Sequence, residues 1–213
     1  MTDNIQKYGF RWAVAHNGGK SCPAPVWRPV ASAYQASLDS NEVNINMGDM
    51  MKIVAGGTFE IADGDESTSE AVWGVCVAVG KSFDGNFMES KTFIPGGTTW
   101  GTNRERQTLI GVVPVDAGVW SIEVTGNAAA FDTETEYLAA VGKNANFTNT
   151  IDTTLVRAQP RVDISTAATT NTLILRLYGV DNSEENQDFS GNFVKMLVVG
   201  NIVQNAPHAP LGV

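Results

Sequence analysis

Val72-Trp73-Gly74-Val75-Cys76-Val77-Ala78-Val79 is the stretch that decides the fold class. Its density of β-branched and other apolar residues predicts a strand that is buried on both faces, because a strand with one face in water alternates apolar and polar side chains. Residues 71–79 are also the longest nearly continuous apolar run, and they are far too short to span a membrane.

A second strand pattern precedes this run. In residues 44–61, large apolar side chains alternate with small or polar ones, and this period of two is typical of strands. The turns Gly48-Asp49 and Gly56-Gly57 interrupt the alternation, so we expect two strands here.

Further strands follow the run. Residues 109–115 and 119–124 flank Asp116-Ala117-Gly118, a three-residue link that predicts a β-hairpin with Trp120, Ile122 and Val124 on one face. Additional strands are expected at residues 155–162, 172–180 and 192–203. Between them, residues 83–106 are glycine-rich and irregular, which predicts a long surface excursion.

One segment favours a helix. Thr133 with Glu136 three residues later forms a capping box, and Gly142 is placed to end the helix after about two turns. The apolar residues between them have helical spacing: Tyr137, Leu138 and Val141. The fold class predicted from these patterns is all-β, a single β-barrel or β-sandwich domain with an extended N-terminal arm and at most one short helix.

Composition restricts the partners. In 213 residues there are 23 acids and 14 bases, a formal charge of −9 that repels phosphate backbones and anionic lipids. We therefore expect no nucleic-acid or membrane partner, and a protein surface instead. The two cysteines indicate no framework of disulfides, and residues 1–11 contain no apolar signal segment, so synthesis in a cytoplasm is expected.

The N-terminal residues differ from the rest. Residues 1–43 combine large aromatic rings with prolines that disfavour regular ladders, so we expect an extended arm that binds another surface. The β domain would cover residues 44–205 and a flexible tail residues 206–213. Removing residues 1–28 should then leave a folded domain. The residues expected to contact that surface are Tyr8, Phe10, Arg11, Trp12 and Trp27.

Motifs that carry chemistry are weak. Gly80-Lys81-Ser82 resembles the end of a phosphate-binding loop, but Val75 stands where the loop requires glycine. His16 and His208 lie in a turn and in the tail, where no packed scaffold would orient a catalytic base. We expect no enzyme and no cofactor.

Two acidic loops offer oxygen atoms of the kind that calcium prefers. Neither loop matches a full calcium-binding pattern, so solvated acidic loops are expected and no metal site is assigned. The residues concerned are Asp63, Asp65, Glu66, Asp181, Glu184 and Glu185.

An alternative to a protein-binding role is a carbohydrate-binding β module, tail-associated or on a surface. Trp100 and Trp120 would be the residues on which sugar rings stack.

A resemblance is spread thinly over most of the chain. It rests on Tyr8-Gly9-Phe10-Arg11, Pro29-Val30-Ala31-Ser32, Gly48-Asp49-Met50-Met51-Lys52, the strand at 74–80, Ser165-Thr166-Ala167-Ala168-Thr169-Thr170 with residues 173–177, and residues 192–198. In these segments the chain resembles the capsid decoration, or cement, proteins of tailed bacteriophages. Met50 stands where such proteins have proline after the Gly-Asp pair, and the leader departs from theirs after Arg11.

The resemblance implies a structural virion protein without catalytic residues. Such a protein binds the outer surface of an icosahedral capsid and cements neighbouring capsomers against the pressure of packaged DNA. The implied partners are the major capsid protein and further copies of the chain, as a homodimer or a homotrimer. The implied location is the outer capsid surface of the virion, assembled in the host cytoplasm.

Overall fold

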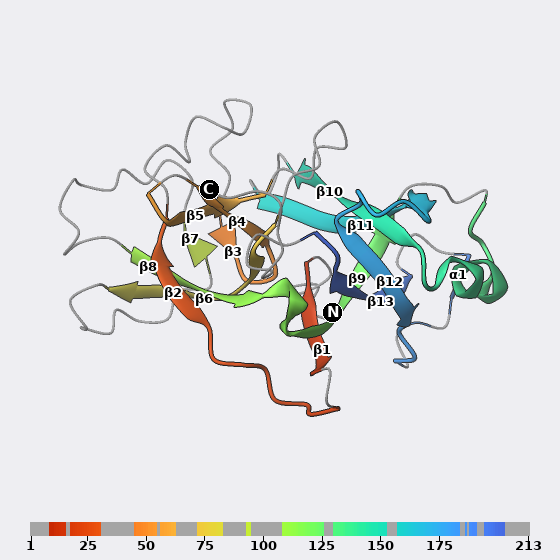
Figure 1. The fold of residues 1–213 in the computed structure, drawn as a ribbon, viewed down its shortest axis with the longest axis horizontal. Helices are drawn as coiled ribbons and strands as arrows, with labels where there is room; N and C mark the ends of the chain where they lie inside the picture. Colours follow the sequence, from red (N-terminus) through yellow and green to blue (C-terminus); the bar gives the residue numbers. More distant parts are fainter. Residues whose placement is uncertain are drawn as a thin grey trace, which may run out of the picture.

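The computed structural model describes residues 9–15, 18–30, 45–54, 56–62, 72–82, 93–94, 108–125, 130–152, 157–183, 186, 188–190 and 194–202. Within these residues the chain forms thirteen strands and one short α-helix, so the prediction of an all-β protein is confirmed. In Figure 1, one sheet lies at the left of the molecule and a second at the right, with the helix at its outer end.

The right-hand sheet has six strands, and five of them close into a barrel. In order across the sheet they are β1 (Arg11–Ala15), β9 (Gly118–Thr125), β11 (Arg157–Ala168), β10 (Asn144–Asp152), β12 (Leu175–Val180) and β13 (Lys195–Gly200). The barrel closes because β13 also pairs with β9. Ser121 of β9 pairs with both Arg11 and Leu197, so β1 and β13 flank β9 on opposite sides. Strand β1 therefore lies outside the ring of five.

The left-hand sheet also curls back on itself. Its strands, in order, are β2 (Val26–Pro29), β8 (Thr108–Pro114), β6 (Gly74–Ser82), β4 (Met50–Val54) and β5 (Thr58–Ile61). Val30, just after β2, forms a bridge to Phe59 of β5 at the far edge. The Arg28 guanidinium supports this closure by donating to the carbonyl of Gly57 at 3.1 Å. A separate pair, β3 (Ile45–Asn46) and β7 (Phe93–Ile94), is antiparallel.

The left-hand sheet is buried on both faces. Neighbouring residues of one strand belong to different clusters: Val75 of β6 packs in the large cluster with the barrel residues, whereas Cys76 packs in the smaller one. Met50 and Met51 of β4 divide in the same way. The small cluster consists of Val30, Ile45, Met51, Phe59, Ile61, Trp73, Cys76, Val79, Ile110 and Val112. This arrangement confirms that the central apolar strand is buried on both faces.

The predicted hairpin at residues 109–124 is wrong, although its two strands are present. Strand β8 belongs to the left-hand sheet and β9 to the barrel. A short 3-10 helix, Val115–Ala117, follows Pro114 and connects the two strands. The indole Nε1 of Trp120 donates to the carbonyl of Val115 at 3.0 Å, which fixes this corner. The link thus carries the chain from one sheet into the other.

The expectation of a separate N-terminal arm is also wrong for the described residues of that segment. Arg11–Ala15 form β1 on the barrel strand β9, and Val26–Pro29 form β2 on β8. Pro29 does not prevent this, because β2 lies at a sheet edge, where a missing N–H donor disrupts no ladder on the outer side. The domain therefore includes residues N-terminal to 44. The proposed tail, residues 206–213, lies outside the described residues.

Strand boundaries elsewhere follow the patterns in part. The turns at Gly48 and Gly56-Gly57 separate β3, β4 and β5, and all three glycines have positive φ. Strand β10 was missed because Asn144–Asp152 is rich in asparagine and threonine and shows no regular alternation of large apolar residues. Of the excursion at residues 83–106, the structure describes only Phe93–Ile94, as β7.

The predicted helix is confirmed as α1 (Glu134–Ala140). Its inner side is formed by Tyr137 and Ala140, whereas Leu138 is exposed. The Tyr137 hydroxyl donates to the carbonyl of Phe131, and the ring packs between Phe131 and Phe189. Gly142 follows with φ of 87°, a conformation that favours glycine at a helix end.

Glu136 gives the start of α1 a pH dependence. Its Oε2 accepts from the backbone N–H of Asp132 at 2.9 Å, from the hydroxyl of Thr133 at 2.9 Å and from the N–H of Thr133 at 3.0 Å. These donors lower the pKa of Glu136, the backbone of Asp132 most of all. A lowered folded-state pKa means that the cap stabilises the helix at neutral pH, and that this contribution is lost as pH falls through the folded pKa.

We therefore expect the Glu136 carboxyl to titrate below the ordinary glutamate range. Carbon-detected NMR of the side-chain carboxyl measures the midpoint directly, with Glu136→Gln identifying the resonance. Thr133→Val removes the hydroxyl donor and should move the midpoint upward. A midpoint at or above the ordinary glutamate value would contradict the capping geometry.

Candidate functional site

The five contact residues expected from the sequence fall into different environments. Phe10 lies in the large core cluster with only 4% of its surface exposed. Its backbone N–H donates to the carbonyl of Gly48 at 2.9 Å, and Gly9 and Gly48 approach closely with φ of 98° and 95°. Phe10 is thus a core residue that ties the start of β1 to the β3–β4 turn. Its assignment as a surface contact is wrong, and Tyr8 lies outside the described residues.

Trp12 is half-buried on β1. Its ring packs edge-to-face on Trp120 of the barrel, with 5.2 Å between centroids and 86° between planes, and Nε1 donates to the carbonyl of Lys20 at 3.1 Å. Gly118 makes this packing possible, because a Cβ there would overlap the Trp12 ring and lie 2.6 Å from the carbonyl oxygen of Val14. One side of the Trp12 indole is therefore used for packing within the chain.

Arg11 precedes Trp12 on the same edge strand and pairs with Ser121 of β9. Its side chain is half-buried. Arg11 and Trp12 thus lie side by side on the strand outside the barrel ring, with opposite side-chain directions along the strand.

Trp27 occupies the matching place in the left-hand sheet. It lies on β2 opposite Gly111 of β8 and is half-buried. A Cβ on Gly111 would lie 3.2 Å from Trp27 Cη2 and 3.1 Å from Pro25 Cβ, so glycine lets both rings cover the β8 backbone. The neighbouring Val26 is 39% exposed. We call β1 and β2 together, Arg11–Ala15 and Val26–Pro29, the N-terminal edge.

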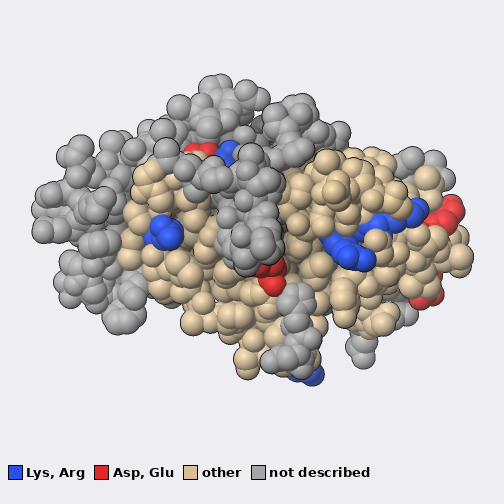
Figure 2. Space-filling view, in the orientation of Figure 1, with Lys and Arg blue, Asp and Glu red and all other residues tan. Residues whose placement is uncertain are grey.

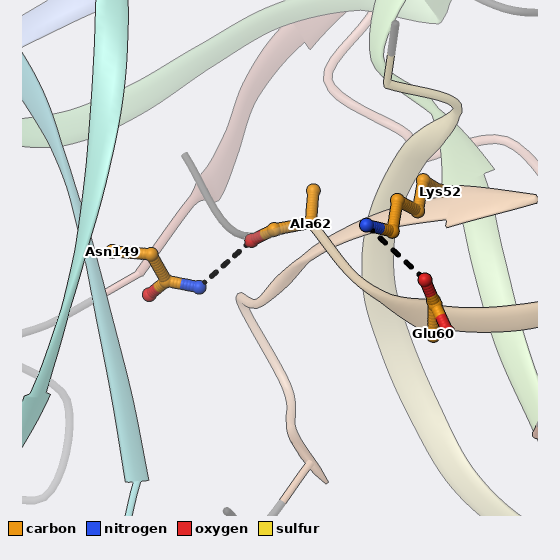
Figure 3. A network of polar contacts seen from close by, with 4 residues as sticks. All are labelled: Lys52, Glu60, Ala62 and Asn149. Atoms are coloured by element: carbon orange, nitrogen blue, oxygen red, sulfur yellow. Dashed lines mark hydrogen bonds and ion pairs between the residues drawn. The ribbon is translucent and has the colours of Figure 1, made fainter. Parts of the chain in front are cut away.

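A polar brace, shown in Figure 3, joins the barrel to the left-hand sheet. The Asn149 side-chain amide of β10 donates to the carbonyl of Ala62 at 3.0 Å. Nearby, Lys52 Nζ of β4 lies 3.1 Å from Glu60 Oε1 of β5, and the two side chains are only 14% and 12% exposed. The Asn149–Ala62 bond joins segments that are far apart in the chain, so no sequence motif marks it, and it connects the barrel to the end of β5. Lys52 and Glu60 are opposite residues of the neighbouring strands β4 and β5, so their ion pair stabilises the left-hand sheet itself.

A second ion pair lies on the barrel. Arg161 Nε of β11 and Glu123 Oε2 of β9 are 3.7 Å apart. Glu123 is buried, so the arginine compensates a charge that would otherwise be costly to remove from water. Like the brace, this pair supports the architecture.

The described part of the acidic loops is used for internal hydrogen bonds. One carboxylate oxygen of Asp181 accepts from the hydroxyl of Ser121, and the other accepts from the N–H of Ser183 at 3.0 Å. In the described portion of the chain, no three side chains of His, Cys, Asp and Glu gather as metal ligands would. Residues 63–71 and 184–185 lie outside that portion, as do His16 and His208.

The cysteines do not form a reactive pair. Cys76 is buried, and burial together with the nearby Asp49 charge raises the pKa of its thiol above the ordinary range. Cys22 is exposed, and partial desolvation raises the pKa of its thiol as well. A raised pKa keeps a thiol protonated and weakly nucleophilic.

The structure does not support the phosphate-loop resemblance, nor Trp120 as a residue on which sugar rings stack. Gly80-Lys81-Ser82 continue β6, with Lys81 paired to Leu109 and Ser82 to Thr108, so their backbone follows a ladder and forms no anion nest. Trp120 is fully buried and therefore offers no face to a sugar. Trp100, the other residue of the carbohydrate hypothesis, lies outside the described residues.

Among the described residues, no helix has the length and apolar character needed to cross a membrane. Comparison of the chain with protein-family models, curated proteins and solved structures finds no match. The N-terminal edge and the segments that resemble cement proteins are therefore the features of the chain that bear on its function.

Proposed function

We propose that the chain is a structural virion protein that binds the outer surface of an icosahedral bacteriophage capsid and cements neighbouring capsomers. Its partners are the major capsid protein and further copies of itself, on the outside of a virion assembled in the host cytoplasm. The proposal assigns no catalytic step and no cofactor. It is the function class that the resembling segments imply, and a body of packed sheets suits a protein that must resist mechanical stress.

The observation that carries the proposal is the N-terminal edge. It provides the half-buried Trp12, Trp27 and Arg11, residue types that dominate binding hot spots, on strands at the margins of both sheets. Each tryptophan is fixed from its inner side, Trp12 by Trp120 and Trp27 by the strand β8. A partner that covers the outer side meets a preorganised ring, so little side-chain entropy is lost on binding.

The repeated subunits of an icosahedral shell would strengthen such a contact. The shell presents many copies of one binding site, and a protein that binds through more than one site gains affinity through effective concentration. The net charge of −9 also suits the outer face, away from the packaged genome.

The test measures binding to shells assembled from the major capsid protein encoded in the same genome. Trp27→Ala and Val26→Lys, the latter at an exposed position, should each weaken binding about tenfold or more, since both change the outer surface of β2. Occupancy is measured by co-sedimentation of shells across a range of protein concentrations.

Asn182→Lys is the matched control for Val26→Lys, because it adds the same side chain at an exposed position beyond β12. It should decorate shells as the unmodified protein does. If Val26→Lys and Trp27→Ala also decorate normally while remaining folded, the N-terminal edge is not the capsid-binding surface.

A further inference from the structure

An exposed apolar patch lies at the end of the barrel that carries α1. Its members are Leu138, Val141 and Tyr178, which are 52%, 36% and 59% exposed. They are three of the large hydrophobic side chains that the described structure leaves most accessible to solvent. Clustered apolar exposure is one of the features by which protein interaction surfaces are recognised.

Local geometry makes the patch continuous. Glu134, Leu138 and Val141 follow one another at spacings of four and three, so they share one flank at the helix and its end. The backbone of Leu177 exchanges hydrogen bonds with Gly142 and Lys143, at 2.8 and 2.9 Å. This pairing brings the outward side chain of Tyr178 beside the end of α1.

Charges of opposite sign border the patch. Glu134, together with Asp132 just before the helix, is exposed at the start of α1. At the other end, Lys143 follows the helix, and the exposed Arg176 lies two residues before Tyr178 on the same face of β12. In Figure 2, acidic atoms gather at the α1 end of the molecule and basic atoms gather over the adjoining barrel strands. Across the patch, the surface is thus acidic at one end, apolar in the middle and basic at the other end.

We propose that this patch binds the same patch of a second copy of the chain about a two-fold axis. A two-fold rotation places apolar centre on apolar centre and sets the acidic end of each copy against the basic end of its partner. A surface of one sign would repel its own copy, whereas this order makes the patch self-complementary. The patch is separate from the N-terminal edge, so the inference stands whether or not the chain binds capsids.

The test is a charge-reversal cycle followed by sedimentation velocity across a wide range of protein concentrations. The unmodified protein should show a concentration-dependent dimer that weakens as salt is added. Glu134→Lys alone, and Lys143→Glu with Arg176→Glu, should each weaken dimerisation about tenfold or more, because they set like charges together. Combining all three substitutions restores opposite charges across the axis and should recover most of the affinity.

Two further variants distinguish dimerisation through the patch from the effect of a change in net charge. Leu138→Glu places a charge at the apolar centre and should leave the protein monomeric but cooperatively folded, since the side chain is exposed. Its melting temperature should match that of the unmodified protein at concentrations where both are monomeric. Lys20→Glu, the same reversal as Lys143→Glu at an exposed site next to β1, should leave dimerisation unchanged.

Three results would overturn the proposal. These are a protein that stays monomeric at every concentration, a dimer indifferent to Leu138→Glu and to the charge reversals, and an assembly larger than a dimer that depends on the same residues. A monomer whose capsid binding falls with Leu138→Glu would assign the patch to the capsid instead.

Discussion

Deleting residues 1–28 is expected to abolish cooperative unfolding. The deletion removes β1, most of β2 and the core residue Phe10, whose loss alone would cost about 3–5 kcal/mol. It also leaves an edge of β8 and the outer face of Trp120 without their partners. Because domains are stable by only about 5–15 kcal/mol, these losses together exceed what the remaining chain can tolerate. Thermal unfolding followed by circular dichroism measures the effect.

Point variants within the same segment sharpen this prediction. Phe10→Ala should lower the free energy of unfolding by about 3–5 kcal/mol, whereas Val26→Ala, at an exposed position, should change it by less than about 0.5 kcal/mol. A trimmed protein that melts cooperatively near the temperature of the full chain would show that the N-terminal strands are dispensable, as the sequence patterns led us to expect.

Gly74→Ala is expected to be the most damaging single-methyl addition among the described residues. A Cβ at this position would overlap the carbonyl oxygen of Val113 and lie 2.8 Å from its carbonyl carbon. Both atoms belong to the backbone of β8, which β2 and β6 hold from either side, so the obstacle cannot turn away as a side chain would. We expect a loss of about 3 kcal/mol or more, measured by denaturant unfolding.

Gly179→Ala is the matched control for Gly74→Ala. Gly179 also lies in a strand, β12, but the nearest atom to an added Cβ is Leu197 Cδ1 at 3.8 Å, an ordinary contact. Alanine there should be neutral or stabilise by up to about 1 kcal/mol, because glycine loses more backbone entropy on folding. Equal effects of the two substitutions would contradict the close approach of β6 and β8.

Prediction from the sequence succeeded where the signal was local. The β-branched run at residues 72–79 identified a strand buried on both faces, and the Thr133–Glu136 pair identified the start of α1. Both depend on side chains within a few positions of one another. Strand β10 gave no such signal, because its few large apolar residues are separated by asparagine and threonine, and its place in the sheet comes from pairing with β11 and β12.

The candidate site was predicted in composition but not in structure. Trp12 and Trp27 were identified as unusual for an N-terminal segment, yet the same rings that suggested a free arm are anchored on Trp120 and over Gly111. Phe10 could not be distinguished from them, since an aromatic residue in a short run without periodicity can face either the core or a partner. The patch around Leu138 and Tyr178 joins a helix to a strand about forty residues later, so no window of sequence contains it.

Local composition was sufficient to establish an all-β protein, the approximate position of many of its strands and the helix α1, because propensity, turn residues and caps act over a few residues. Long-range packing determined the partners of those strands: β8 and β9 belong to different sheets, and residues 11–15 and 26–29 pair at the margins of both. The physical reason is that a strand ladder forms between the edges that the buried side chains bring together. The sequence of one strand alone therefore does not determine which other strand it pairs with.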